Sequence, residues 1–178
     1  GVWLGKFNEF ERMERLRVMQ DSTDTEWIFL IDSDEFVVMG NIEDTIKKIS
    51  PYHAAFGLMI DRVSRSKQLA EVALDKPIWE QFPVRADITK SILKAAIEKP
   101  FIFNKNYFTI CWCCHTLYKK GAQDSISLSE RFPEFFDIDH FKWTKTMKSR
   151  LSTRIEHFKS DSRHSWNNEL SKAIDIFN

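Results

Sequence analysis

The sequence of 178 residues is poor in glycine and rich in aromatic residues. It contains five Gly against fifteen Phe and six Trp. So many aromatic residues argue against disorder, and so few glycines argue against a glycine-rich loop that would bind phosphate. The length is that of one domain, and the hydrophobic fraction of 43% is enough for a sizeable core.

Cysteine is scarce and confined to one place. Cys111, Cys113 and Cys114 lie within four residues of one another, which excludes a disulfide framework. An odd number of cysteines is typical of a reducing compartment, so a cytoplasmic location is expected. Together with His115 they raise the possibility of a zinc site, but the spacing is wrong for a zinc knuckle and no second cysteine pair exists. Buried cysteines are the favoured interpretation.

The sequence also lacks net charge and long apolar runs. Its 26 basic and 26 acidic residues cancel, so no overall field favours a nucleic-acid or membrane partner. No run approaches the ~18 apolar residues of a membrane span, and no signal peptide is visible. Because the chain begins with Gly1 rather than Met, we expect it to come from a longer protein.

The hydrophobic pattern predicts an α/β fold, with a mixed sheet flanked by helices. Helices are expected over residues 9–20, 41–49, 87–97, 147–158 and 166–177. Strands are expected over residues 26–31, 54–60, 101–103, 107–111 and 137–143, the last of them at a sheet edge. Asn41 and Asp87 are the expected N-caps of their helices. The two strands around residues 104–106 are expected to form a hairpin, and residues 63–84 a long loop.

The segment Glu26–Phe36 contains five apolar residues that end in Asp32-Ser33-Asp34-Glu35. The apolar run predicts a strand buried on both faces, and open α/β sheets bind ligands at the carboxyl ends of such strands. Two carboxylates there require a compensating cation. The pattern therefore predicts Mn²⁺ or Mg²⁺ bound by Asp32 and Asp34, together with a phosphate. Glu35 points to the opposite face and is expected to orient a neighbour or accept a substrate hydroxyl. The alternative is an acidic turn without a ligand.

A second group of candidates lies late in the chain, in Asp139–Trp143. His140 is either a metal ligand brought back to the two aspartates or a packed histidine with one satisfied nitrogen. The basic run that follows is mostly the solvated face of a helix. Lys142 and Lys145, which are nearest to His140, are the expected diphosphate contacts. Nucleic-acid binding by this run is disfavoured because the whole chain is neutral.

The segment Trp27–Phe36 resembles the tryptophan, hydrophobic, Asp-x-Asp-Glu-Phe segment of GT-A-fold glycosyltransferases, particularly family-two-like bacterial and phage proteins. His140–Trp143, followed by a basic helix, resembles the late histidine segment of the same group. The resemblance implies a Rossmann-like transferase of the hexosyltransferase type, with a UDP- or GDP-sugar donor and a glycan or other acceptor. It implies that Asp34 is the main metal ligand, that Asp32 contacts the ribose or the metal, and that His140 completes the metal site.

The same resemblance implies an acidic catalytic base between the two motifs if the enzyme inverts. Glu80 and Glu130 are the candidates, although neither lies in a recognised motif. Only 31 residues precede Asp32, too few for the first βαβ half, which binds the nucleotide base in such folds. We therefore expect residues 1–178 to form a single glycosyltransferase-like domain that is the C-terminal part of a larger GT-A domain, or a pared-down fold.

Two other functions remain open. A haloacid-dehalogenase-like phosphatase also has Asp-x-Asp after a buried strand and would use Asp32 as its nucleophile. In that class Thr or Val stands two residues after the second aspartate, where this chain has Phe36. The third possibility is a non-catalytic remnant that binds a nucleotide or a sugar, which the short N-terminal part favours.

Overall fold

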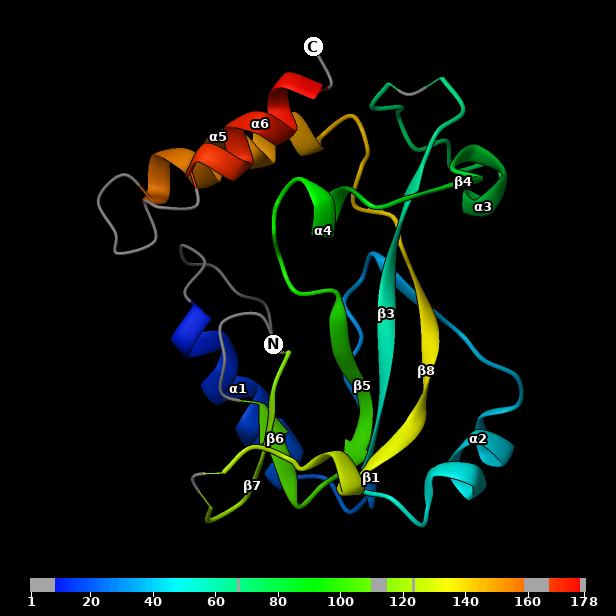
Figure 1. Ribbon diagram of the computed structural model, residues 1–178, viewed down its shortest axis with the longest axis vertical. Coiled ribbons are helices and arrows are strands. Elements are labelled where there is room, and N and C mark those ends of the chain that lie inside the picture. Colours follow the sequence, from blue (N-terminus) through cyan, green and yellow to red (C-terminus); the bar gives the residue numbers. More distant parts are fainter. Residues whose placement is uncertain (1–8, 67, 110–114, 123, 159–166, 177–178) are drawn as a thin grey trace. The chain divides into compact units, whose positions relative to one another are not determined.

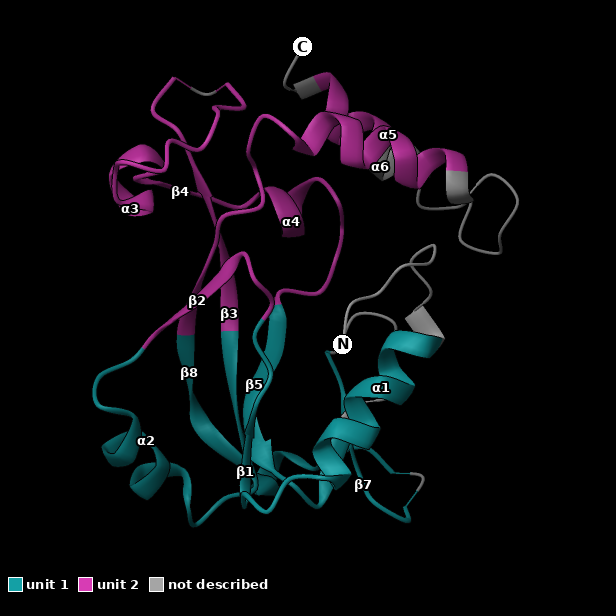
Figure 2. Ribbon diagram, turned by 180° about the vertical axis from the view of Figure 1, so that it is seen from behind, with its two compact units in different colours: residues 1–31, 39–57, 98–136 teal, residues 32–38, 58–97, 137–178 magenta. Residues whose placement is uncertain are grey.

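The computed structural model describes residues 9–66, 68–109, 115–122, 124–158 and 167–176. These residues belong to two compact units, coloured separately in Figure 2. Unit 1 comprises Gly1–Ile31, Met39–Gly57 and Glu98–Phe136, and unit 2 comprises Asp32–Val38, Leu58–Ile97 and Asp137–Asn178. Strands β3 (Ala54–Val63) and β8 (Arg131–His140) contribute residues to both units.

The main sheet is mixed and flanked by helices, which confirms the predicted α/β class (Figure 1). Its strand order is β1-β5-β3-β8-β2, and β4 (Val84–Ala86) pairs with β3. β1 (Trp27–Phe29) is antiparallel to β5 (Glu98–Asn104), and β2 (Glu35–Val38) is antiparallel to β8. A separate two-stranded sheet consists of β6 (Tyr107–Thr109) and β7 (Leu117–Lys119).

Unit 1 has an apolar core and three helical segments. The helices are α1 (Glu9–Asp21), α2 (Ile42–Ile49) and the 3-10 helix η1 (Leu128–Glu130). The core cluster consists of buried side chains from β3, β5, β6, β7 and the following loop: Ala54, Phe56, Phe103, Tyr107, Leu117 and Ile126.

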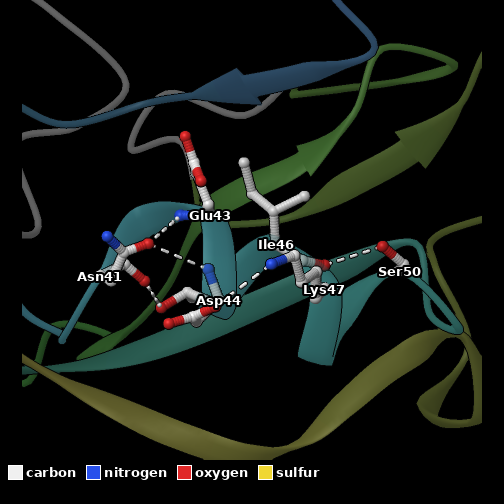
Figure 3. A network of polar contacts seen from close by, with 7 residues as sticks. Asn41, Glu43, Asp44, Ile46, Lys47 and Ser50 are labelled. Carbon is white, nitrogen blue, oxygen red and sulfur yellow. Dashed lines mark hydrogen bonds and ion pairs between the residues drawn. The ribbon is translucent and has the colours of Figure 1, made fainter.

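Helix α2 begins where the sequence predicts. The Asn41 Oδ1 atom accepts hydrogen bonds from the amides of Glu43 at 2.8 Å and Asp44 at 3.2 Å, so two of the unpaired amides of the first turn are satisfied (Figure 3). Ser50 ends the helix, and its amide bonds to the Ile46 carbonyl just before Pro51.

Unit 2 contains α3 (Ile78–Gln81), α4 (Ile88–Ser91), α5 (Met147–Phe158) and α6 (Asn167–Ile176). The apolar stripe predicted for α5 is confirmed, because Met147 and Leu151 are each 1% exposed. They pack in one buried cluster with Ile88, Trp143 and Ala173. Trp166 and Phe177, which the prediction assigned to the last helix, lie outside the described residues. No helix among the described residues is long and apolar enough to cross a membrane.

Two predictions about the strands are wrong. β1 is short, and its three residues are only half-buried, because β1 ends the strand order and has β5 as its only neighbour among the described strands. β8, in contrast, is not at an edge. It lies between β3 and β2, so Ile138, Asp139 and His140 are all buried instead of alternating.

The helix predicted over residues 87–97 is also wrong in length. Only α4 is helical, and the Leu93 and Ala95 amides bond back to Ile88 and Thr89 in an irregular turn. Lys94, beyond the end of α4, has φ of 51°, a left-handed conformation that stops a helix from continuing. Periodicity alone did not reveal this stop, because a lysine rarely adopts such a conformation.

The predicted hairpin of residues 101–111 does not form. β5 and β6 are joined by a tight turn, in which the Asn104 Oδ1 atom accepts the Asn106 amide at 3.0 Å. However, β6 pairs with β7, whereas β5 pairs with β1. The turn chemistry was therefore correctly located, but the pairing partners come from further away in the sequence.

Candidate functional site

The Asp-x-Asp segment is a turn leading into β2, and all of its residues belong to unit 2. The Glu35 amide bonds to the Asp32 carbonyl at 3.0 Å, which closes the turn. The buried Glu35 side chain reaches back, and its Oε2 atom accepts the Asp32 amide at 3.1 Å. This agrees with the predicted orienting role of Glu35. Asp32 and Asp34 are half-buried.

The late motif lies directly beside this turn. In the pairing of β2 with β8, Glu35 is the partner of His140. One residue later, the Phe141 amide donates to the Asp34 carbonyl at 2.8 Å. Two segments that are about a hundred residues apart in the sequence are therefore joined through their backbones. The backbone of His140 therefore lies beside the acidic turn, whereas a metal shared by His140 and the aspartates stays a prediction.

Asp61, at the end of β3, is the centre of a buried hydrogen-bond network. Its side chain is 2% exposed, and its Oδ2 atom accepts the Thr89 amide at 2.6 Å. Its Oδ1 atom accepts the Thr89 hydroxyl at 2.8 Å and the Trp143 indole N–H at 2.7 Å. The Nδ1 atom of His140 lies 3.1 Å from the same oxygen.

Burial alone would raise the pKa of Asp61. The hydrogen bonds from His140, Thr89 and Trp143 together outweigh the burial, so the pKa lies below its ordinary value. Asp61 is therefore an ionised carboxylate inside unit 2. Its cost of burial is offset by donors from α4, β8 and the segment after β8.

His140 has the surroundings that the packed-histidine alternative describes. Its side chain is 8% exposed, and Nδ1 is engaged by Asp61. Its other ring nitrogen, Nε2, makes no hydrogen bond to any described residue. One nitrogen is thus satisfied and the other is open to a ligand.

Aromatic rings surround the motifs. Phe36, Trp79 and Phe141 contact one another edge to face, with ring centroids 5.0 to 5.5 Å apart. The Trp79 indole N–H donates to the Asp139 Oδ2 atom at 3.0 Å. The second oxygen of Asp139 lies 3.7 Å from the Arg62 Nε atom. These contacts fix α3 against β8 and leave Trp79 44% exposed.

The two predicted diphosphate contacts have different environments. Burial, together with Arg154 and Arg150, lowers the pKa of Lys142 to about 8, while Asp61 and Asp34 act in the opposite direction. Lys142 is thus within electrostatic reach of Asp34. Lys145 is exposed, and its ammonium pairs with Glu71 at 3.0 Å.

The two predicted bases belong to different units and have different surroundings. Glu80 is exposed on α3. Glu130 belongs to unit 1, where hydrogen bonds from Ser127 and Tyr107 lower its pKa to about 2. A carboxylate with so low a pKa is a weak proton acceptor near neutral pH. Its contacts give Glu130 a structural role at η1. Burial of the phenol, together with the hydrogen bond to Glu130, raises the pKa of Tyr107 to about 12.

Metal binding at this turn depends on how many ligands the protein itself supplies. Among the described residues, no three His, Cys, Asp or Glu side chains are grouped closely enough to hold a metal ion. Mg²⁺ sites that serve phosphate substrates use one or two carboxylates, and the substrate supplies further oxygens. The Asp34 carboxylate accepts no hydrogen bond from any described residue, so its oxygens are open. The turn therefore fits a cation that is shared with a phosphate.

Sequence reasoning missed Asp61, Thr89 and Trp143 as members of the site. The available signal was a carboxylate in an otherwise apolar strand, because such a group requires partners. Of the cysteine cluster, residues 111–114 lie outside the described residues. His115 is described, and its Nδ1 atom contacts the Glu98 carbonyl.

Comparisons with known proteins leave the site to be judged on its own geometry. No family model matches the chain, and neither the curated proteins nor the solved structures contain a match.

Proposed function

We propose that the protein transfers a sugar from a nucleotide-diphosphate donor, such as a UDP- or GDP-sugar, to a glycan or other acceptor. Asp32 and Asp34 would hold Mn²⁺ or Mg²⁺ together with the donor diphosphate. When bound, the cation would neutralise the charge that develops on the leaving diphosphate. The fold would then be a GT-A-like one, of which this chain carries the metal-binding part.

The observation that carries this proposal is the hydrogen bond from the Phe141 amide to the Asp34 carbonyl, at 2.8 Å. The resemblance to glycosyltransferases rests on two separate motifs, and it would lose its meaning if they lay far apart. Their union in unit 2, with Glu35 paired to His140, supports a shared site.

The charges near the turn also support a diphosphate ligand. Lys142 interacts electrostatically with Asp34 and has Arg150 and Arg154 nearby. A group of cations beside two carboxylates matches a ligand that consists of a cation and an anion. With a pKa of about 8, Lys142 remains mostly protonated at neutral pH and available to a phosphate oxygen. Lys145 would act as a second contact after leaving its exposed ion pair with Glu71, which holds it only weakly.

Asp32 differs from Asp34 in its role. Its amide is bound by Glu35, which fixes the backbone of the turn. We assign Asp34 to the cation and Asp32 to the cation or the donor ribose. Neither Glu80 nor Glu130 is assigned a role in the transfer.

The test measures release of the nucleoside diphosphate from a panel of UDP- and GDP-sugars, with and without Mn²⁺, in the wild type and in Asp34→Asn. We expect Mn²⁺-dependent release that falls by about 100-fold or more in the variant. The matched control is Asp24→Asn, the same change at an exposed loop position, which should leave the rate unchanged.

Two results would contradict the proposal. If Asp34→Asn is as active as the wild type, Asp34 does not bind a cation that the reaction needs. Calorimetric binding of Mn²⁺ and UDP or GDP, without turnover of any donor, would favour the non-catalytic alternative instead.

A further inference from the structure

The Asp61 carboxylate is bound on both of its oxygens by groups that can only donate. The Thr89 amide donates to Oδ2 at 2.6 Å, and the Trp143 indole N–H donates to Oδ1 at 2.7 Å. Backbone amides and indole nitrogens have no acceptor function. Both oxygens of Asp61 are therefore acceptors, and Oδ1 also accepts the Thr89 hydroxyl, so Oδ1 carries no proton toward the histidine.

This decides the state of the neighbouring histidine. The His140 Nδ1 atom lies 3.1 Å from Oδ1, in an environment where Asp61 is 2% and His140 8% exposed. Because the carboxylate oxygen accepts, Nδ1 must donate and carry the proton. In a neutral imidazole the lone pair then lies on Nε2, the nitrogen that makes no hydrogen bond to a described residue.

The position of His140 makes this tautomer relevant to the turn. Its residue pairs with Glu35, whose side chain holds the Asp32 amide. The next residue is bonded to the Asp34 carbonyl. A carboxylate that holds the far nitrogen of a ligand histidine is a common arrangement around protein-bound cations, where it fixes the ring and its tautomer.

We propose that Asp61 is a positioning residue that holds His140 in the Nδ1–H tautomer and keeps the Nε2 lone pair available to a cation at the Asp32–Glu35 turn. The second part of this proposal rests on the proposed function. The first part, the tautomer, does not depend on it.

The tautomer can be read directly by ¹H–¹⁵N correlation NMR of the metal-free protein, with His140 assigned by comparison with His140→Gln. The measurement is made at about pH 8.5, well above the ordinary histidine pKa of about 6.5. We expect a protonated Nδ1 and an unprotonated Nε2 in the wild type. A proton on Nε2, or on both nitrogens, would overturn the proposal without any variant being needed.

The variant Asp61→Asn tests the cause. The asparagine side chain has only one oxygen. When that oxygen accepts the Thr89 amide, the NH₂ group faces the His140 Nδ1 atom. We expect the His140 proton to move to Nε2. The matched control is Thr89→Val, which removes one hydrogen bond to Asp61 but keeps the carboxylate, so the wild-type tautomer should persist. An unchanged tautomer in Asp61→Asn, or an equal change in Thr89→Val, would overturn the proposal.

The link to the turn is tested by adding Mn²⁺ and UDP and following paramagnetic broadening of the His140 ring signals. We expect strong broadening in the wild type and in Thr89→Val. Asp61→Asn should bind Mn²⁺ about 10- to 100-fold more weakly. Broadening without donor turnover would support the positioning role while contradicting sugar transfer. Sharp His140 signals in Mn²⁺-loaded protein would overturn the second part of the proposal.

Discussion

The buried cluster of unit 1 is apolar and aromatic, whereas unit 2 buries carboxylates beside its apolar core. Glu35, Asp61 and Asp139 are the buried carboxylates among the described residues, and all three belong to unit 2. Unit 1 buries Gln20 and Lys99 as its larger polar side chains. Because a buried carboxylate is costly unless it is bonded, such groups are concentrated at functional sites more often than chance would place them. The contrast supports the candidate site proposed in unit 2.

Two acidic residues show the difference most clearly. Glu130 in unit 1 and Asp61 in unit 2 both have lowered pKa values, and each accepts several hydrogen bonds. Glu130 closes a capping box at η1 and can exchange its partners for water. The Asp61 side chain is almost fully buried and accepts hydrogen bonds from three separate segments. Similar pKa directions thus arise from a local cap in one unit and from long-range packing in the other.

The largest expected effect is on stability. Asp61→Ala should lower the free energy of unfolding by about 3–5 kcal/mol, because the Thr89 amide and the Trp143 indole would stay buried without an acceptor. Glu130→Ala should cost only about 1 kcal/mol, since water can reach the freed donors. Urea unfolding followed by circular dichroism measures both. Equal losses of unfolding free energy in the two variants would show that the two carboxylates stabilise their units to the same extent.

An intermediate effect is expected at the helix starts. Asn41→Ala should lower the free energy of unfolding by about 1 kcal/mol, because α2 loses the cap that accepts two amides. Asp87→Ala should cost less than about 0.5 kcal/mol, because its carboxylate bonds only to the Ser91 hydroxyl and Asp61 accepts the Thr89 amide of α4. The same unfolding experiment compares them. A larger loss in Asp87→Ala would show that α4 has a local cap after all.

The smallest effect is the acid dependence of Glu130. Its pKa falls from 4.5 to about 2 in the folded protein, so ionised Glu130 stabilises unit 1 above about pH 4.5. That contribution is lost as the pH decreases through the interval from 4.5 to 2. Because the carboxylate is largely accessible to solvent, we expect less than about 1 kcal/mol. Unfolding free energies measured across this interval should decrease more steeply in the wild type than in Glu130→Gln. Parallel curves for the two proteins would contradict the lowered pKa of Glu130.

Local sequence signals were sufficient for elements with their own start, stop and stripe. Helix α2 has Asn41 before it and Pro51 after it, and α5 has apolar residues at helical spacing, so both were predicted correctly. Helix α4 is shorter than predicted because residues 92–95 form an irregular turn with a left-handed Lys94, and no glycine or proline marks that turn. The predicted pairing of β6 was wrong because strand pairing is a long-range choice, and β6 pairs with β7 rather than with β5.

The candidate site divides in the same way. The acidic turn, His140 and Lys142 were found from the sequence, because unusual charges next to apolar runs are visible in one dimension. Asp61 was not assigned to the site, because its importance comes from donors 28, 79 and 82 residues further along the chain. No periodicity or spacing rule connects such positions.

The sequence by itself determined the α/β class, the N-cap of α2, the apolar stripe of α5, and the two motifs of the candidate site. These depend on nearest neighbours and on the contrast between apolar and charged residues. Only the tertiary structure decided that β8 lies inside the sheet, that His140 pairs with Glu35, and that Asp61 accepts four hydrogen bonds. The physical reason is that a buried carboxylate or a strand edge must find its partners in space, and the chain can supply them from any distance.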